Sequence, residues 1–182
     1  ITGSVYALSS FDPDGVGPSP PQLVAAGDFT SAGGITANRI ARWDGTSWQP
    51  LGEGIDGTVA ALATFDPDGA GPQQAKLVAG GSFSLAGGVA SSNIAKWDGS
   101  TWTALGAGMN EGVEVLTTFD LDGDGAAAPQ LIAGGAFTNA GGAAANHIAR
   151  WDGATWEGFG TGMNHRVLAL SSLTSGGTGP LP

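Results

Sequence analysis

The most constraining feature of this sequence is an internal repeat of constant length. Along the 182 residues the same residue types return every 54 positions, with no insertion or deletion between units. The clearest series are Val5, Val59, Val113 and Val167; Phe11, Phe65 and Phe119; Leu23, Leu77 and Leu131; and Trp43, Trp97 and Trp151. A fixed period of this size is typical of folds in which similar units stack on one another.

The period divides the chain into three complete units and the start of a fourth. We expect a single partial domain over residues 1–182, built from units at 5–58, 59–112 and 113–166. The remaining residues, 167–182, are expected to form an extra first strand and a linker-like tail, because that tail is rich in glycine, serine and proline.

Each unit contains four short apolar runs separated by turn-forming residues. In the second unit we expect strands over residues 59–65, 76–83, 93–98 and 101–106. Glycine and proline after the first run prevent continued strand pairing. The Asp98-Gly99 pair between the last two runs favours a tight hairpin, whose backbone must adopt positive φ. Each unit is therefore predicted to be a sheet of four antiparallel strands.

A sheet of this size cannot bury both of its faces alone. Apolar residues occupy neighbouring positions, as at Leu77, Val78 and Ala79, so both faces need cover. Identical sheets stacked side by side supply that cover. Small residues in the first strand, such as Ala61 and Ala63, suit the crowded inner edge of a radial arrangement. The predicted fold class is all-β, with three complete β-propeller blades of four strands and one extra strand.

The unit resembles the kelch repeat, a known type of propeller blade. The residues that carry the resemblance are a double glycine ending the second strand, an aromatic residue in the third and a tryptophan opening the fourth. In the second unit these are Gly80-Gly81, Trp97 and Trp102, whereas the first unit has Ala26-Gly27 in place of the doublet. The unit departs from kelch in its greater length, its aspartate-rich first loop and its tryptophan where tyrosine is usual.

Within that resemblance, the sequence is similar to long arrays in secreted or surface-anchored bacterial proteins and to the propellers of fungal cortical polarity markers. The resemblance implies an extracellular or cell-surface location. It says less about function, because one fold serves many functions.

All six tryptophans lie in three copies of one hairpin sequence. Each indole can bury up to ~150–250 Å² against an adjoining blade, so we interpret the tryptophans as contacts between blades. An aromatic row that stacks on sugar rings is the alternative. The basic residue before the first tryptophan is expected to pair with the aspartate after it or to lie over an indole ring. These basic residues are Arg42, Lys96 and Arg150.

The loop after the first strand of each unit is rich in aspartate and glycine. It reads DPDGVGP, DPDGAGP and DLDGDGA in the three units. Calcium prefers about six to eight oxygen ligands, which such loops can supply. The third loop resembles calcium loops of integrin-type propeller blades and EF-hand-like repeats, although their later acidic ligand is missing. We name Asp120, Asp122 and Asp124 as candidate calcium ligands, with an aspartate-capped turn as the alternative.

The sequence contains few patterns that are typical of an enzyme active site, and we assign no catalytic residue. His147 and His165 stand where the other units have different residue types, so we interpret each as a separate surface histidine. Galactose-oxidase-like enzymes share a kelch-type propeller, but they need tyrosine, histidine and cysteine around copper. Here Tyr6 is the single tyrosine and cysteine is absent.

The charge balance limits the classes of binding partner that the chain is expected to have. Six basic residues against 16 acidic ones give a net charge of −10, which repels nucleic acid and anionic membranes. No apolar stretch reaches the roughly 18–20 residues of a membrane span. A propeller closes with about four to eight blades, so we expect partners among other copies of the chain or further blades of a longer chain.

Together these observations predict a non-enzymatic extracellular or cell-surface propeller that serves as a scaffold or as a protein-interaction and adhesion module. One alternative is a calcium-dependent or carbohydrate-binding adhesion domain, whose partner would be a surface glycan. Another is the non-catalytic part of a larger propeller enzyme.

Overall fold

The computed structural model of the chain describes residues 1–15, 17–69, 73–120 and 128–171. Every regular element in these ranges is a β-strand, which confirms the all-β prediction. The described residues include no helix that could cross a lipid bilayer. The strands form three main sheets, one for each complete unit of the repeat.

The three sheets share one strand order, in which the first strand of the unit lies at one edge and the fourth at the other. The first sheet contains β1 (Thr2–Phe11), β2 (Gln22–Ala32), β3 (Ile35–Thr36), β4 (Ile40–Trp43) and β5 (Trp48–Pro50). The second unit contains β6 (Thr58–Phe65), β7 (Lys76–Ser82), β8 (Leu85–Ala86), β9 (Val89–Ala90), β10 (Ile94–Trp97) and β11 (Trp102–Ala104). The third contains β12 (Val113–Phe119), β13 (Gln130–Gly135), β14 (Asn139–Ala140), β15 (Ala143–Ala144), β16 (Ile148–Trp151) and β17 (Trp156–Gly158).

Each main sheet is an antiparallel meander, as expected for a propeller blade. The four strands predicted in the second unit are confirmed as β6, β7, β10 and β11. The small hairpin of β8 and β9 was predicted as a turn. Its two connecting residues, Gly87 and Gly88, have φ of 57° and 76°, the geometry of a tight two-residue hairpin turn.

The hairpin between the third and fourth strands is closed by the predicted aspartate and glycine, but the two residues have different roles. Gly99 has a φ of 104°, whereas Asp98 does not adopt positive φ. The Asp98 carboxylate instead accepts hydrogen bonds from the backbone N–H groups of Ser100 at 2.9 Å and Thr101 at 2.8 Å. Aspartate is therefore required here as an acceptor, and glycine for its backbone conformation.

The second glycine of the Gly-Gly doublet is needed because two backbones approach closely. A Cβ at Gly81 would collide with the carbonyl oxygen of Thr58 on the neighbouring strand, and Gly27 and Gly135 have the same surroundings. A Cβ at Gly80 would meet the side chain of Val113 in the next blade. A side chain can adjust more easily than a backbone, which explains why the first unit keeps the second glycine but has alanine as the first residue.

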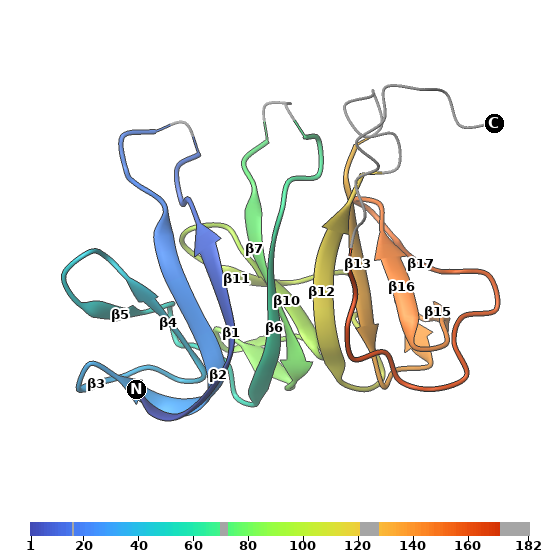
Figure 1. The fold of residues 1–182 in the computed structure, drawn as a ribbon, viewed down its shortest axis with the longest axis horizontal. Coiled ribbons are helices and arrows are strands. Elements are labelled where there is room, and N and C mark those ends of the chain that lie inside the picture. Colours follow the sequence, from blue (N-terminus) through green and yellow to red (C-terminus); the bar gives the residue numbers. More distant parts are fainter. Residues whose placement is uncertain (16, 70–72, 121–127, 172–182) are drawn as a thin grey trace.

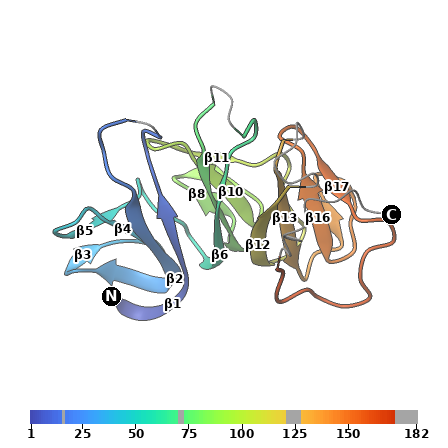
Figure 2. The ribbon, with the colours of Figure 1, turned by 45° about the horizontal axis from the view of Figure 1, so that its top comes forward.

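The three blades stand side by side with their first strands adjacent. Figure 1 shows β1, β6 and β12 next to one another, with the remaining strands of each blade extending away from them, and Figure 2 shows the same order from another direction. Along β6 buried and half-buried residues alternate, and the buried positions include Ala61 and Ala63. The small side chains therefore lie at the crowded inner edge, as predicted.

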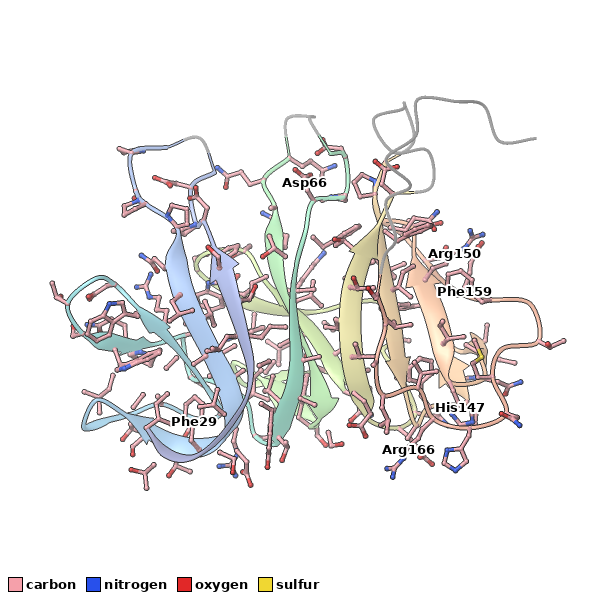
Figure 3. All side chains as sticks on the ribbon, viewed as in Figure 1. Phe29, Asp66, His147, Arg150, Phe159 and Arg166 are labelled. Atoms are coloured by element: carbon pink, nitrogen blue, oxygen red, sulfur yellow. The ribbon has the colours of Figure 1, made fainter. Side chains whose placement is uncertain are left out.

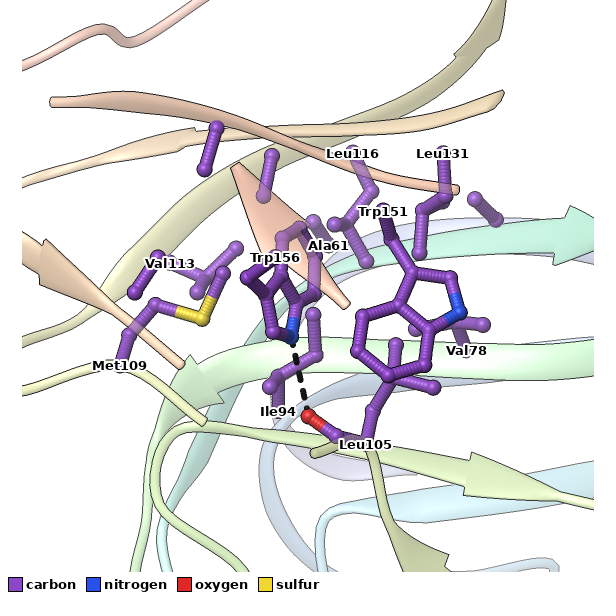
Figure 4. Close-up of a cluster of buried hydrophobic side chains, with 14 of the residues drawn as sticks. Ala61, Val78, Ile94, Leu105, Met109, Val113, Leu116, Leu131, Trp151 and Trp156 are labelled. Atoms are coloured by element: carbon purple, nitrogen blue, oxygen red, sulfur yellow. Dashed lines mark hydrogen bonds between the residues drawn. The ribbon is translucent and has the colours of Figure 1, made fainter. Parts of the chain in front are cut away.

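The hydrophobic core lies between the blades. One cluster joins the first and second blades and another joins the second and third. Figure 4 shows the second of these junctions, in which the Nε1–H of Trp156 donates a hydrogen bond to the carbonyl oxygen of Leu105. Trp102 makes the equivalent bond to Leu51 at the first junction, also at 3.0 Å. The interpretation of the tryptophans as contacts between blades is confirmed at both junctions.

Residues 163–171 follow the third blade but form no strand. They continue along the path that the equivalent residues take between earlier blades. The N–H of Met163 donates to Asn146 O at 2.9 Å, as Met109 does to Ser92 O. Val167 lies against Gly134, as Val113 lies against Gly80. Within residues 167–182, where an extra strand and a tail are predicted, only 167–171 are described, and these form no regular strand.

Candidate functional site

The two ends of the blades carry different loops. Figure 3 shows Asp66, in the loop after a first strand, at one end of the molecule and His147 at the opposite end. The aspartate-rich loops lie at the first end. The second end carries the turns between the second and third strands and the connections from one blade to the next. Each end is a candidate surface for binding.

In the first two aspartate-rich loops, carboxylates shape the turn. Asp14 accepts a hydrogen bond from the N–H of Ser19 at 3.1 Å, and this bond lowers the pKa of Asp14. Asp68 accepts the corresponding bond from Gln73 at 3.1 Å. The pKa of Asp66 is raised, chiefly because burial penalises its charged form. These contacts are those of an aspartate-capped turn.

The predicted calcium site is described only at its edge. Asp120 lies at the end of β12, whereas Asp122 and Asp124 lie outside the described residues. Within the described part of the chain, no group of three or more histidine, aspartate or glutamate side chains is placed to hold a metal ion. Calcium at the third loop stays a prediction.

The hairpin aspartates do not form the expected repeated ion pairs. Asp44, Asp98 and Asp152 bind backbone N–H groups of their own turns, which lowers the pKa of each carboxyl. Arg42 instead donates to Gln22 Oε1 at 3.1 Å, and Arg150 pairs with Glu157 at 2.7 Å. Of the two predicted arrangements, the repeated ion pair was wrong, because the turn already uses both carboxylate oxygens. The cation over an indole ring stays a prediction.

A shallow groove lies at each blade junction, at the end opposite the aspartate-rich loops. The first has a volume of about 250 Å³ and includes Thr30, Asn38 and Arg39. The second, of about 460 Å³, includes Ser84, Ser92 and Asn93, which stand one 54-residue period later. The two grooves thus share five equivalent positions, the fourth and fifth being Ile55 and Asp56 in the first groove and Met109 and Asn110 in the second. The rest of the lining differs, because the first groove also includes Leu85 and Gly88 of the second blade, whereas the second groove includes no residue of the third blade.

The junction residue at one side of each groove also joins the two blades. Asp56 Oδ1 accepts hydrogen bonds from the N–H groups of Ser84 at 2.9 Å and Leu85 at 2.8 Å. One period later, Asn110 Oδ1 accepts bonds from Thr138 at 3.0 Å and Asn139 at 2.9 Å. These contacts fix the connection between the blades beside each groove.

The other side of each groove contains a residue in an unusual backbone conformation. Arg39, Asn93 and His147 have φ of 65°, 65° and 64°, and they are the non-glycine residues with positive φ in the described chain. Such a conformation is uncommon for residues other than glycine, and asparagine and histidine adopt it more readily than arginine. The conformation lets the backbone of one residue both donate and accept, since Asn93 N donates to Phe83 O and Asn93 O accepts from Gly81 N. The residue type at this position differs among the units, but the side chains also bond to the backbone: Asn93 Nδ2 donates to Met109 O at 2.9 Å and Arg39 Nη1 donates to Phe29 O at 3.3 Å.

The two histidines are neighbours in the structure, whereas they were predicted to be separate surface residues. The rings of His147 and His165 lie 6.5 Å apart between centroids and 25° from parallel. His147 Nδ1 is buried and makes no hydrogen bond with the described residues. Each residue is unique within its own repeat position, so the period gave no sign that they would meet. Two rings alone do not make a metal centre.

The grooves were not predicted either, although a repeated pattern of polar residues in the sequence indicates them. Small polar residues recur at one unit position as Thr30, Ser84 and Thr138, and at another as Asn38, Ser92 and Asn146. Recurring polar residues next to a conserved turn could have indicated a repeated surface feature. The volume of a groove between two blades depends on the distance between the blades, and that distance cannot be predicted from the sequence.

Comparison with known protein families gives one match. The family model described as "Domain of unknown function (DUF5122) beta-propeller" matches residues 22–43, the segment from β2 to the end of β4. Comparisons with curated proteins and with solved structures gave no match. The family match agrees with the four-stranded sheets, and the fold is that of β-propeller blades.

Proposed function

We propose that this chain is a non-enzymatic β-propeller module of the extracellular space or cell surface, of kelch-like type, which acts as a scaffold and as a protein-interaction or adhesion module. The observation that supports this most directly is the repeated groove. Five equivalent positions line a groove near two successive blade junctions, and the side chains at these positions differ between the two grooves.

Repetition of a shallow groove favours an extended partner over a small substrate. A partner that contacts two grooves at once gains affinity through effective concentration, even when each contact alone is weak. The first groove contains both a basic residue, Arg39, and an acidic residue, Asp56, whereas the polar residues of the second groove are uncharged serines and asparagines. Polar groups of both signs suit the mixed backbone and side-chain groups of a protein segment. A polysaccharide of the cell surface is the alternative partner.

A second candidate is calcium-dependent adhesion through the aspartate-rich loops. One observation favours it, because Asp14 Oδ1 and Asp68 Oδ1 stand at equivalent positions and neither forms a hydrogen bond with the described residues, although both atoms are buried. An oxygen that is available in successive loops is a suitable calcium ligand.

The test is binding of the purified chain to immobilised extracellular proteins and cell-wall polysaccharides, measured by surface plasmon resonance. The double variant Ser84→Arg/Ser92→Arg fills the second groove and should weaken binding at least about tenfold, by loss of one of two linked contacts. Thr103→Arg adds one arginine on the exposed side of β11, outside the groove, and is the control for the introduction of arginine at the surface. No binding to any surface, or equal binding by all three proteins, contradicts the proposal.

The same measurement with calcium and with a chelator separates the two candidates. Binding through the grooves should be unchanged by the chelator. Binding that requires calcium, and that is lost in Asp120→Asn but kept in the groove variant, would replace the first candidate by the second.

A further inference from the structure

The contact between blades is made of the same parts at both junctions. The exit loop of one blade, after its fourth strand, packs on the tryptophan pair of the next. At the first junction Leu51 O accepts from Trp102 Nε1, and Gly54 O accepts from Gly87 N at 2.8 Å. A Cβ on Gly52 would lie 3.2 Å from the ring of Trp97. The equivalent residues make the same contacts at the second junction.

At the first blade the receiving half of this contact is uncovered. Leu23 is 44% exposed, whereas its equivalents Leu77 and Leu131 are fully buried. The tryptophan pair of this blade, Trp43 and Trp48, is half-buried, while the corresponding pairs of the other two blades are buried. Val5 and Leu8 are exposed on the same blade. Apolar side chains gathered in this way mark an interaction surface.

At the third blade the inserting half is uncovered. Phe159 is 41% exposed, whereas its equivalents Leu51 and Leu105 are 1% exposed. Met163 is exposed where Met109 is buried. No described atom lies within 4 Å of a Cβ placed on Gly160, although the equivalent glycines face an indole ring. The exit loop of the third blade, residues 159–162, thus has the form of the first two exit loops and lacks their tryptophan pair.

We propose that a second copy of this chain occupies both surfaces, so that the exit loop 159–162 of each copy docks on the Trp43–Trp48 face of the other. The inference rests on the proposed function in treating the chain as a module that assembles. A second copy is the occupant that the structure favours, because the molecule already contains this interface twice and presents one complementary half at each end. Two copies with three blades each give six, within the roughly four to eight blades that close a propeller.

Docking requires residues 163–171 to move. These residues lie on the third blade where the first strand of a following blade would lie, as β12 lies on the second blade. The β1 strand of the incoming copy would occupy the same space. β1 is paired along its length with β2. Among the described residues, the segment 163–171 pairs with no strand, and beyond Met163 the backbone hydrogen bond that holds it runs from Val167 N to Gly135 O at 3.2 Å. The incoming β1 therefore displaces it.

Charge opposes the association and gives a further check. Each copy has a net charge of −10, so two copies repel one another at low ionic strength. Added salt screens this repulsion and leaves an apolar contact intact. Association through the proposed surfaces should strengthen with salt, whereas association through ion pairs should weaken.

The experiment is sedimentation equilibrium of the 182-residue chain over a range of concentrations. We expect a monomer–dimer equilibrium, with a dimer of twice the chain mass of 17.9 kDa. Gly160→Asn should weaken the dimer at least about tenfold, because its side chain would strike the indole pair, while asparagine tolerates the φ of 53°. Gly142→Asn is the matched control, since Gly142 also has positive φ and open surroundings.

A third variant tests the displacement of the segment. Val167→Asp removes its apolar contact with Gly134 and should strengthen the dimer, which loss of structure alone would not do. A chain that stays monomeric at all concentrations overturns the inference, but leaves groove binding intact. A dimer that is insensitive to Gly160→Asn, or equally weakened by Gly142→Asn, also overturns it, as does a series of larger species instead of a closed dimer.

Discussion

Trp102 combines two roles that make it the central residue of its junction. Its ring packs against Trp97 with centroids 5.4 Å apart, and its Nε1–H satisfies the carbonyl oxygen of Leu51 in the preceding blade. Both groups of the hydrogen bond are buried. Large aromatic residues with one polar atom suit such a position, because they supply area and also pair a backbone group that water cannot reach.

Replacing Trp102 by phenylalanine should therefore destabilise the chain by about 1–3 kcal/mol, since the carbonyl of Leu51 is left buried without a donor. The measurement is the free energy of unfolding from urea denaturation. Trp48→Phe makes the same change in the first blade, where the indole is half-buried and donates to no described residue. An equal loss in the two variants would contradict the role of the hydrogen bond.

The hairpin aspartates predict how stability depends on pH. Asp44, Asp98 and Asp152 have pKa values below the ordinary 3.8, chiefly through the backbone hydrogen bonds that each carboxylate accepts. A carboxyl with a lowered pKa in the folded state stabilises the fold fully above its unfolded pKa and loses that contribution as the pH falls through its folded value. We expect the melting temperature to be level from pH 7 to about 5 and to fall below pH 4.

The check is a series of thermal melts followed by circular dichroism between pH 7 and pH 2. In the variant with all three aspartates changed to asparagine, the fall below pH 4 should be smaller. An unchanged acid profile in that variant would show that other carboxylates cause it.

The roles of single residues could be predicted where the same residue type recurs in every unit of the repeat. The tryptophans are large and recur in every unit, which was sufficient to assign them to the contacts between blades. Their hydrogen-bond partners could not be predicted, because Leu51 and Leu105 are 51 residues away in the chain. The partner of Arg42 was predicted wrongly, since sequence proximity to Asp44 gave no indication that the turn would use that carboxylate.

At the scale of the strand, the close pairing of first and second strands sets a limit on side-chain size. Gly81→Ala places a methyl group against the backbone of Thr58, which cannot move without breaking the strand pairing. We expect a loss of about 1–3 kcal/mol or more in the free energy of unfolding. Gly80→Ala should cost less, because it meets the side chain of Val113 and because the first blade already has Ala26 there.

Both variants can be compared in one urea titration, with the unmodified chain as reference. A larger loss for Gly80→Ala than for Gly81→Ala would contradict the explanation given for the doublet. Strand positions themselves were predictable because turn residues bound each apolar run. The hairpin of β8 and β9 was not, since two-residue strands leave too short a pattern beside the glycines.

At the scale of the whole molecule, the propeller architecture followed from one physical requirement: each blade must cover the faces of its neighbours. The calcium prediction at Asp120, Asp122 and Asp124 remains open. The grooves and the pair of His147 and His165 could not be predicted, because both depend on how residues from different units meet in space. Neither has a signature within a single unit.

The constant spacing of the junctions has a consequence for how such a chain can change over time. Every junction joins one exit loop to the tryptophan pair that follows about 50 residues later, and no contact of this kind skips a blade. Loss or duplication of one whole unit in the gene would reproduce the same junction at the new boundary. The length of the protein can thus vary in steps of one blade, while a change of a few residues between junctions would disturb the fold.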